Sequence, residues 1–368
     1  MVTPATATRV REEIVRLGAR GLPVAEYSRA VGQLLTKVVP AEGTCLMTVD
    51  PATLLPTAEY VENGMPAPAL LRMVDIELRE PDFNKWVTLS QAGARAASLS
   101  DATRGELDAS RRQREIRRPG GFSDELRSVL ASGTGTWGQL TVFRERRRPY
   151  FSSAEVAFVS SVAATIADGL RRAMLFDLLD VGLGDVGLFM LDADDRVTLT
   201  NPAAERLLDN LDAGDRAGSA LPLAVATTVR QARAVGGATD GRAVPEGLRP
   251  AVARVRTARG GWLIVRGSLM GHEPDAPVAV ILEPARRAQM APLMAHAYGL
   301  TVAERRVTEL VARGLSTQQI AHRLDLSTYT VQDHLKSIFA KSDTSSRGDL
   351  VARLFVDHYA DTLTSDSG

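Results

Sequence analysis

The sequence predicts a multidomain α+β protein in which two antiparallel-sheet domains precede an all-α domain of four helices. Three observations support this fold class. The chain has 368 residues, enough for two or three domains of about 150 residues each. Strand-like runs separated by turn signals recur as far as Leu282. The residues after Leu300 instead carry three successive helix starts, each with its own capping residue.

The composition excludes several classes of protein. Hydrophobic residues make up 45% and charged residues 24% of the chain, which is typical of soluble globular domains. No apolar run reaches the ~18 residues of a membrane span, and the N-terminus lacks a signal-peptide pattern. We therefore expect a cytoplasmic protein without a membrane partner. The single cysteine, Cys45, excludes disulfide frameworks and lies in an apolar run typical of a buried strand, and the scattered histidines predict no metal site.

The N-terminal region shows two helical segments, then strands, then a long helix. Val10–Leu17 and Val24–Val39 have helical periodicity, and the polar stretch Ala92–Arg118 is expected to be helix plus loop. Ser152 and Glu155 form a capping box that opens a helix running to Leu179. The expected strands are Thr44–Val49, Pro56–Val61, Trp86–Ser90, Glu125–Ala131 and Trp137–Arg144.

The end of this region resembles a GAF domain. The resemblance rests on W-G-x-L-T-V-F-R from Trp137 to Arg144 and on F-S-x-x-E from Phe151 to Glu155, and it covers residues 20–175. It implies a GAF-like sensor domain over residues 1–176. Such a fold hosts several ligands or none, so it fixes no ligand. The cyclic-nucleotide signature of the family is missing and Cys45 is not placed for chromophore attachment, so we assign no cofactor.

The long helix from Ser153 to Leu179 allows two interpretations. Its apolar residues recur at steps of three and four, for example at Val159, Ala163 and Ile166. It either pairs with its copy in a second subunit or only covers its own sheet, and the sequence favours neither.

Residues 177–290 form a second expected domain. The strand-like Val186–Leu191, an Asp-rich turn, and a helix starting at Asn201-Pro202 resemble the opening of a PAS domain. Three later strands fit the remaining sheet, with a Gly260-Gly261 turn between the first two: Ala251–Thr257, Trp262–Met270 and Pro277–Leu282. The resemblance implies a PAS-like sensor domain whose alanine-rich middle leaves a small or filled cavity.

Two charged features outside these motifs have ordinary explanations. Asp194-Asp195 is expected to be a polar hairpin turn, because a phosphoacceptor pocket would also need a lysine at a later strand end. The arginine clusters Arg111–Arg118 and Arg144–Arg148 could contact DNA, but the interleaved acidic residues favour solvated faces of a helix and a hairpin.

Residues 291–368 form the predicted helical domain. Thr301 with Glu304 and Ser316 with Gln319 fit the S/T-x-x-E/Q capping box, and Ser327 is a suitable N-cap for a third helix. Two short helices joined by a tight link at Leu324–Leu326 predict a helix-turn-helix, whose second helix enters the DNA major groove.

The third of these helices has one apolar and one polar face. Val331, Leu335, Ile338 and Phe339 fall on the side that would face a core. The opposite side carries amide, carboxylate and ammonium groups, which can pair with adenine, cytosine and guanine edges respectively. The residues expected to contact bases are Tyr329, Gln332, Asp333 and Lys336.

This region resembles the DNA-binding domain of the LuxR family of transcriptional regulators. The resemblance runs from Leu300 to Phe355 through LT-x-x-E, GLS-x-x-x-IA, L-x-x-S-x-x-TV-x-x-HL-x-x-I-x-x-K and a final Ser346-Arg347. Ser342-Asp343 departs from the apolar residue and glycine usual in the family. The phosphate contacts expected from helix starts and from the resemblance are Thr317, Gln318, Thr328, Thr330 and Lys341. The resemblance also implies dimerisation through the fourth helix, by Arg347, Val351, Leu354 and Phe355.

The function predicted from these motifs is that of a one-component transcriptional regulator. The segment from Ala297 to Asp357 contains eight basic and seven acidic residues, so one copy should bind DNA weakly. We therefore expect a homodimer that binds double-stranded DNA at two half-sites. A small-molecule effector of unknown identity, or a partner, would act at the sensor-type domains. In the alternative, these domains bind no ligand and serve only as a dimerisation or interaction scaffold for a constitutive DNA-binding protein. We expect no enzyme and no catalytic residue, because the chain has no phosphate loop, nucleophile elbow or H-E-x-x-H motif.

Overall fold

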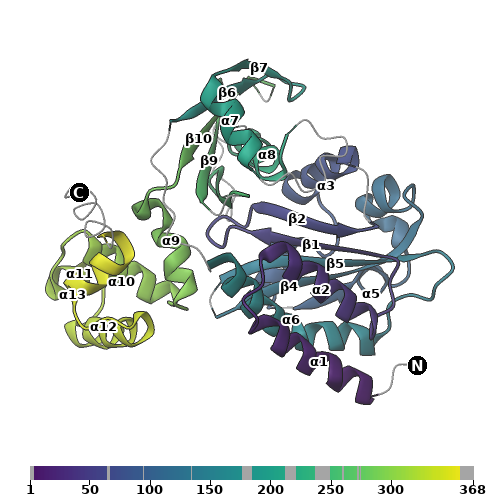
Figure 1. Ribbon diagram of the computed structural model, residues 1–368, viewed down its shortest axis with the longest axis horizontal. Helices are drawn as coiled ribbons and strands as arrows, with labels where there is room; N and C mark the ends of the chain where they lie inside the picture. Colours follow the sequence, from purple (N-terminus) through teal and green to yellow (C-terminus); the bar gives the residue numbers. More distant parts are fainter. Residues whose placement is uncertain are drawn as a thin grey trace, which may run out of the picture. The chain divides into compact units, whose positions relative to one another are not determined.

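The computed structural model describes residues 4–63, 67–93, 95–133, 135–175, 185–211, 221–236, 249–258, 261–271, 273 and 275–356. The chain divides into two compact units, the larger containing Met1–Ser132 and Thr136–Pro284 and the smaller containing Ala285–Gly368. The larger unit holds two five-stranded antiparallel sheets and the smaller one is helical (Figure 1). This confirms the predicted fold class. The boundary expected between residues 176 and 177 lies outside the described residues.

The first sheet has the strand order β2-β1-β5-β4-β3. Figure 1 shows helices α1, α2 and α6 along one side of it and α3 on the other. In chain order the elements are α1 (Pro4–Gly18), α2 (Val24–Thr36), β1 (Gly43–Val49), β2 (Pro56–Glu62), α3 (Ala67–Arg79), α4 (Trp86–Gln91), β3 (Ala96–Ser98), α5 (Leu99–Ala102), η1 (Leu107–Ala109), η2 (Gln113–Arg117), β4 (Phe122–Ser132), β5 (Gly135–Glu145) and α6 (Ser153–Leu175).

Helix α6 is the central helix of this sheet. Its capping box is confirmed, because the Glu155 amide donates to the Ser152 hydroxyl and the Ser152 amide donates to the Glu155 carboxylate. The apolar stripe that includes Val159, Ile166 and Leu170 is fully buried against β4, α1 and α2. Among the described residues, Ser153–Met174 is also long and apolar enough to cross a membrane, but its packing is that of a core helix. Of the two interpretations of this helix, the structure favours the one in which it covers its own sheet.

The segment between β2 and β4 differs most from prediction. The strand predicted at Trp86–Ser90 is wrong, because this segment forms α4. Trp86 and Leu89, three residues apart, are buried against Met47 and Val129, whereas Val87 is 38% exposed. A short apolar run does not distinguish a strand from a buried helix turn, which explains the error. The edge strand β3 and the helix α3 were not predicted.

Both arginine clusters contain buried members, so the prediction of solvated faces is wrong for these residues. The side chains of Arg112, Arg117 and Arg144 are 0%, 3% and 5% exposed. Glu125 accepts hydrogen bonds from Arg112 at 2.8 Å and from Arg117 at 3.0 Å, and Arg144 pairs with Glu155. A buried guanidinium must be paired to be tolerated, and these pairs hold the sheet to the surrounding segments instead of facing DNA.

The second sheet has the strand order β7-β6-β10-β9-β8. Asn201 caps α7 by accepting from the Ala204 amide, with proline at the first helical position, as the sequence predicts. The predicted Gly260-Gly261 turn lies partly outside the described residues. The elements are β6 (Gly187–Leu191), β7 (Val197–Thr200), α7 (Pro202–Asn210), α8 (Leu223–Gly236), β8 (Val252–Arg256), β9 (Trp262–Leu269) and β10 (Val278–Pro284).

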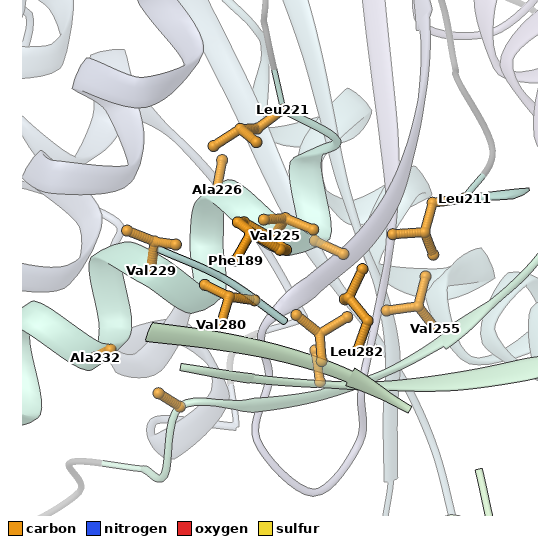
Figure 2. Close-up of a cluster of buried hydrophobic side chains, with 14 of the residues drawn as sticks. Phe189, Leu211, Leu221, Val225, Ala226, Val229, Ala232, Val255, Val280 and Leu282 are labelled. Carbon is orange, nitrogen blue, oxygen red and sulfur yellow. The ribbon is translucent and has the colours of Figure 1, made fainter. Parts of the chain in front are cut away.

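Helix α8, which was not predicted, covers this second sheet. Figure 2 shows Val225 and Val229 of α8 beside Val280 and Leu282 of β10, and all four are buried. The same core contains Leu55, which comes from the loop between β1 and β2 of the first sheet. The two sheets therefore share one hydrophobic core at this point.

Polar contacts reinforce the junction between the two sheets. Asp50, which is 1% exposed, accepts hydrogen bonds from the Arg254 amide at 2.9 Å and from its guanidinium at 2.8 Å. Arg230 of α8 pairs with Asp75 of α3 at 2.8 Å. Because Asp50 is buried, loss of this pairing would leave an uncompensated charge, so the pair fixes how β8 meets the first sheet.

Replacing Leu55 with alanine should destabilise the larger unit by about 2–4 kcal/mol, because a buried leucine truncation loses burial and leaves a cavity. The free energy of opening, measured by hydrogen exchange of β8 and β9 amides, checks this. Leu199→Ala is the matched control, because Leu199 is 64% exposed on β7 and should change stability by less than about 0.5 kcal/mol. Equal effects of the two substitutions would contradict a shared core.

Candidate nucleic-acid interface

The helical unit is assembled from short, individually capped helices. Its elements are α9 (Arg287–Ala297), α10 (Val302–Ala312), α11 (Thr317–Leu324), α12 (Thr328–Ser342), α13 (Arg347–Val351) and η3 (Ala352–Val356). The capping boxes predicted at Thr301 and Ser316 are confirmed, and the Ser327 hydroxyl accepts from the Thr330 amide at 3.0 Å. Each cap satisfies N–H groups that a helix start leaves unpaired, so the sequence itself sets where the helices begin.

Glu304 connects α10 to α12. Its carboxylate accepts from the Thr301 amide at 2.6 Å, the Ser337 hydroxyl at 2.7 Å and the Lys341 ammonium at 2.7 and 2.9 Å. Burial alone would raise the pKa of Glu304, but these hydrogen bonds, the one from Lys341 foremost, outweigh burial and lower its pKa to about 2. The sequence indicated only the cap, because the pairing with α12 depends on how the helices pack.

The turn between α11 and α12 depends on one left-handed residue. Asp325 has φ 55°, and the Leu326 amide donates to the Ala321 carbonyl at 2.9 Å. Aspartate tolerates this conformation better than most residues. Beyond the turn, Val331 and Ile338 are fully buried and Leu335 is 7% exposed, which confirms the predicted core side of α12.

The opposite side of α12 is polar and open. Tyr329 is 72% exposed, and Gln332, Asp333 and Lys336 are also exposed. The spacing of these residues brings them to one side of the first half of the helix. Within the part of the chain that the structure describes, none of these four side chains makes a hydrogen bond or ion pair. Their donors and acceptors are therefore available to a partner.

The residues predicted to contact phosphate lie in different settings. Gln318 and Thr328 are exposed at the starts of α11 and α12. The Thr317 hydroxyl accepts from the Arg347 guanidinium at 2.9 Å, and the Thr330 hydroxyl lies 2.8 Å from the Ser327 hydroxyl.

Lys341 forms an ion pair with Glu304, and its side chain remains 35% exposed. An ammonium has three N–H donors, and Glu304 accepts two hydrogen bonds from it. One donor thus remains for another acceptor.

The residues predicted to form a dimer contact are also placed differently from one another. Leu354 is 3% exposed and packs in the core of its own unit, so it offers little surface to a second copy. Val351 is half-buried, and Arg347 donates to the Leu315 carbonyl and to Thr317. The side chain of Phe355 lies outside the described residues.

The departure at Ser342-Asp343 is accommodated locally. Asp343 takes the left-handed conformation, with φ 53°, in which glycine would be usual. The Ser342 hydroxyl is buried and donates to the Ile338 carbonyl at 2.7 Å, and the Arg353 guanidinium donates to the Asp343 carbonyl. The loop before α13 therefore closes without a glycine.

Gly314 ends α10 with φ 80° and has open space where a Cβ would point. Gly314→Ala should therefore cost about 1–2 kcal/mol through backbone strain alone. Hydrogen exchange of α10 and α11 amides gives the free energy of opening and so measures this loss of stability. Gly348→Ala, in α13, has no left-handed φ and should be neutral or stabilising by up to about 1 kcal/mol. A loss at Gly348 as large as that at Gly314 would contradict the backbone explanation.

Known protein sequences similar to this chain include bacterial regulators. Residues 299–354 match the family of bacterial regulatory proteins, luxR family. The monoamine regulon transcriptional regulator of Klebsiella aerogenes is 42% identical over 57 residues, which are 16% of this chain and 25% of that protein. The chain thus spans about a quarter of the length of this curated relative.

Solved structures similar to this chain include GAF domains, which cover its N-terminal part. A GAF domain/HD domain protein from Geobacter sulfurreducens is 20% identical, covering 42% of this chain and 97% of that chain with a TM-score of 0.31. The Vibrio cholerae VqmA dimer, described in connection with LuxR-type receptors, is 17% identical, covering 49% of this chain and 83% of that chain with a TM-score of 0.21.

Proposed function

We propose that this chain, which ends in a LuxR-type helix-turn-helix domain, is a DNA-binding transcriptional regulator that inserts α12 into the major groove. The proposal depends on one observation: the exposed side of α12 presents four polar side chains that have no partners among the described residues. The opposite side of the same helix is packed in the hydrophobic core of the unit. A rigid helix with open donors and acceptors is the usual means of reading base edges.

The proposed roles follow from the chemistry of each side chain. Lys336 donates to guanine, Gln332 pairs with adenine, and Asp333 accepts from the cytosine amino group. Tyr329 lies beside them at the start of the helix and contacts the neighbouring base.

Phosphate contacts flank this surface. The exposed Gln318 and Thr328, together with Thr317 and Thr330, lie at two helix starts, where backbone N–H groups and the helix dipole favour an anion. The remaining donor of Lys341 reaches a phosphate oxygen without releasing Glu304.

A homodimer is the proposed active species. Basic and acidic residues are nearly balanced in the helical unit. A single copy therefore has little net positive charge with which to neutralise phosphates. Two copies on half-sites about 34 Å apart would double these contacts. The exposed part of the α13 region around Arg347 and Val351 is the proposed contact, and the sheet-bearing unit is the proposed site of signal control. Because the proposed target is chromosomal DNA, the cytoplasm is the proposed location of the protein.

The test is a fluorescence-anisotropy titration of the full chain with short fragments of its own genome, combined with analytical ultracentrifugation of the complex. We expect saturable binding to a few fragments, two chains for each site, and an affinity that falls with salt concentration. Equal binding to all fragments, or one chain for each site at saturation, would contradict the proposal.

A further inference from the structure

A half-open cavity of about 260 Å³ lies in the larger unit, where its two sheets meet. One wall comes from the first sheet and its helices α3 and α4, including Met47, Met73 and Trp86. The other wall comes from α8, including Leu223 and Thr227. The cavity is thus formed jointly by both sheet-bearing parts.

The size and walls of the cavity limit what it can hold. An apolar cavity of about 150 Å³ accepts benzene, and drug-sized ligands occupy about 300 Å³ or more. At about 260 Å³ this cavity fits a molecule of one or two rings. Most of its lining is apolar, with one aromatic ring from Trp86.

Two lining residues each carry a buried polar atom that lacks a partner within the part of the chain that the structure describes. Gln139 and Thr53 are 3% and 5% exposed, and among the described residues neither the Gln139 amide oxygen nor the Thr53 hydroxyl has a hydrogen-bond partner. An unsatisfied buried polar group lowers the stability of the folded protein. A bound molecule would remove this cost if it donated a hydrogen bond to the Gln139 oxygen.

Each charged group of the lining makes at least one hydrogen bond within the protein. Glu77 accepts from the Arg127 guanidinium at 2.9 Å, Lys85 donates to the Glu80 carbonyl, and Arg249 donates to the Ala52 carbonyl. Glu77 is already paired with a guanidinium, so a cationic molecule would meet no free carboxylate among the described lining residues, whereas Lys85 and Arg249 keep N–H donors beyond those given to backbone carbonyls. The lining therefore favours a molecule without positive charge.

We propose that this cavity binds a compact molecule of one or two rings, without positive charge, that donates a hydrogen bond to the Gln139 side-chain oxygen. Such a molecule contacts α3 and α8 together, and these helices are already linked by the Arg230–Asp75 ion pair. It therefore stabilises the junction of the two sheets. The role of the cavity as the effector site rests on the proposed regulatory function, whereas the binding itself does not.

Isothermal titration calorimetry of the full chain with indole tests the proposal, with 1-methylindole as the probe that lacks the donor. We expect one saturable indole site. Indole should bind about 3–10-fold more tightly than 1-methylindole, although the methyl group adds apolar area, because one hydrogen bond contributes about 1 kcal/mol. Gln139→Met should abolish this preference and leave 1-methylindole binding unchanged or stronger.

Val74→Trp should fill the cavity and abolish indole binding, whereas Val15→Trp should not, because Val15 is 57% exposed on α1 and does not line the cavity. If Val74→Trp lowers the melting temperature, the Gln139→Met result decides alone. Absence of saturable indole binding, or an unchanged preference in Gln139→Met, would overturn the proposal. DNA binding is measured in a separate titration without indole. An absence of ligand binding in the cavity can therefore be distinguished from an absence of the proposed DNA-binding function.

Discussion

Replacing Glu304 with alanine is expected to destabilise the helical unit by about 2–4 kcal/mol, because it removes part of a helix cap and several hydrogen bonds to a charged group. The substitution leaves the Lys341 ammonium and the Ser337 hydroxyl without their acceptor and removes half of the capping box at Thr301. Water can hydrate the Lys341 ammonium, whose side chain is 35% exposed, but it cannot readily replace the contact that Ser337 makes with the buried Glu304 carboxylate.

Hydrogen exchange of α10 and α12 amides in the full chain gives the free energy of opening for this unit. Glu309→Ala is the control, since Glu309 lies on the same helix but is exposed. We expect a change below about 0.5 kcal/mol there. If both substitutions had similar effects, Glu304 would not link the two helices.

The pKa of Glu304 also predicts how stability depends on pH. Because folding lowers this pKa from its ordinary value near 4.5 to about 2, the carboxylate stabilises the folded unit fully above pH 4.5. This contribution should be lost as the pH falls from 4.5 towards 2. Opening free energies measured across this range should fall less steeply in Glu304→Gln than in the parent chain, and parallel curves would contradict the assignment.

Replacing Lys336 with alanine is expected to weaken binding to the preferred DNA site by about 1–3 kcal/mol, which is roughly 5- to 150-fold. The proposed reason is the loss of a base-edge hydrogen bond from the open side of α12. Binding to sites altered at the contacted base should weaken much less, so the preference at that position should relax. Anisotropy titrations with the preferred site and its single-base variants measure both quantities at one salt concentration.

Lys37→Ala is the matched control for Lys336→Ala. It removes the same charge from the larger unit, where Lys37 is 54% exposed and pairs with Glu13. We expect its effect on DNA affinity to be less than twofold. If Lys336→Ala weakened binding equally for every sequence, Lys336 would contact phosphate and not a base.

The helical unit was predictable from sequence because its information is local. Capping residues at Thr301, Ser316 and Ser327 fix where helices begin, and the apolar spacing of α12 fixes which side is buried. These features depend on residues within one or two turns of each other. Asp343 is a partial exception, because it adopts a left-handed conformation at a position where the LuxR family usually has glycine.

What the sequence did not reveal depends on contacts between distant segments. Trp86 and Leu89 suit a strand or a helix equally until Met47 and Val129 are placed beside them. Likewise, Glu125 pairs with Arg117 and Arg112, which lie eight and thirteen residues before it in the sequence. No local sequence pattern shows that these charged side chains are buried. The cavity between the sheets was missed for the same reason, since α8 was not predicted.

The most direct measurement of the central claim is selection of binding sites by the full chain from randomised double-stranded oligonucleotides, followed by sequencing of the bound fraction. If α12 reads base edges, the selected pool should converge on one inverted repeat with half-site centres about one helical turn apart. Lys336→Ala should lose that preference at one position in each half-site. A bound pool that stays as diverse as the starting pool would contradict the claim that this helix reads DNA sequence.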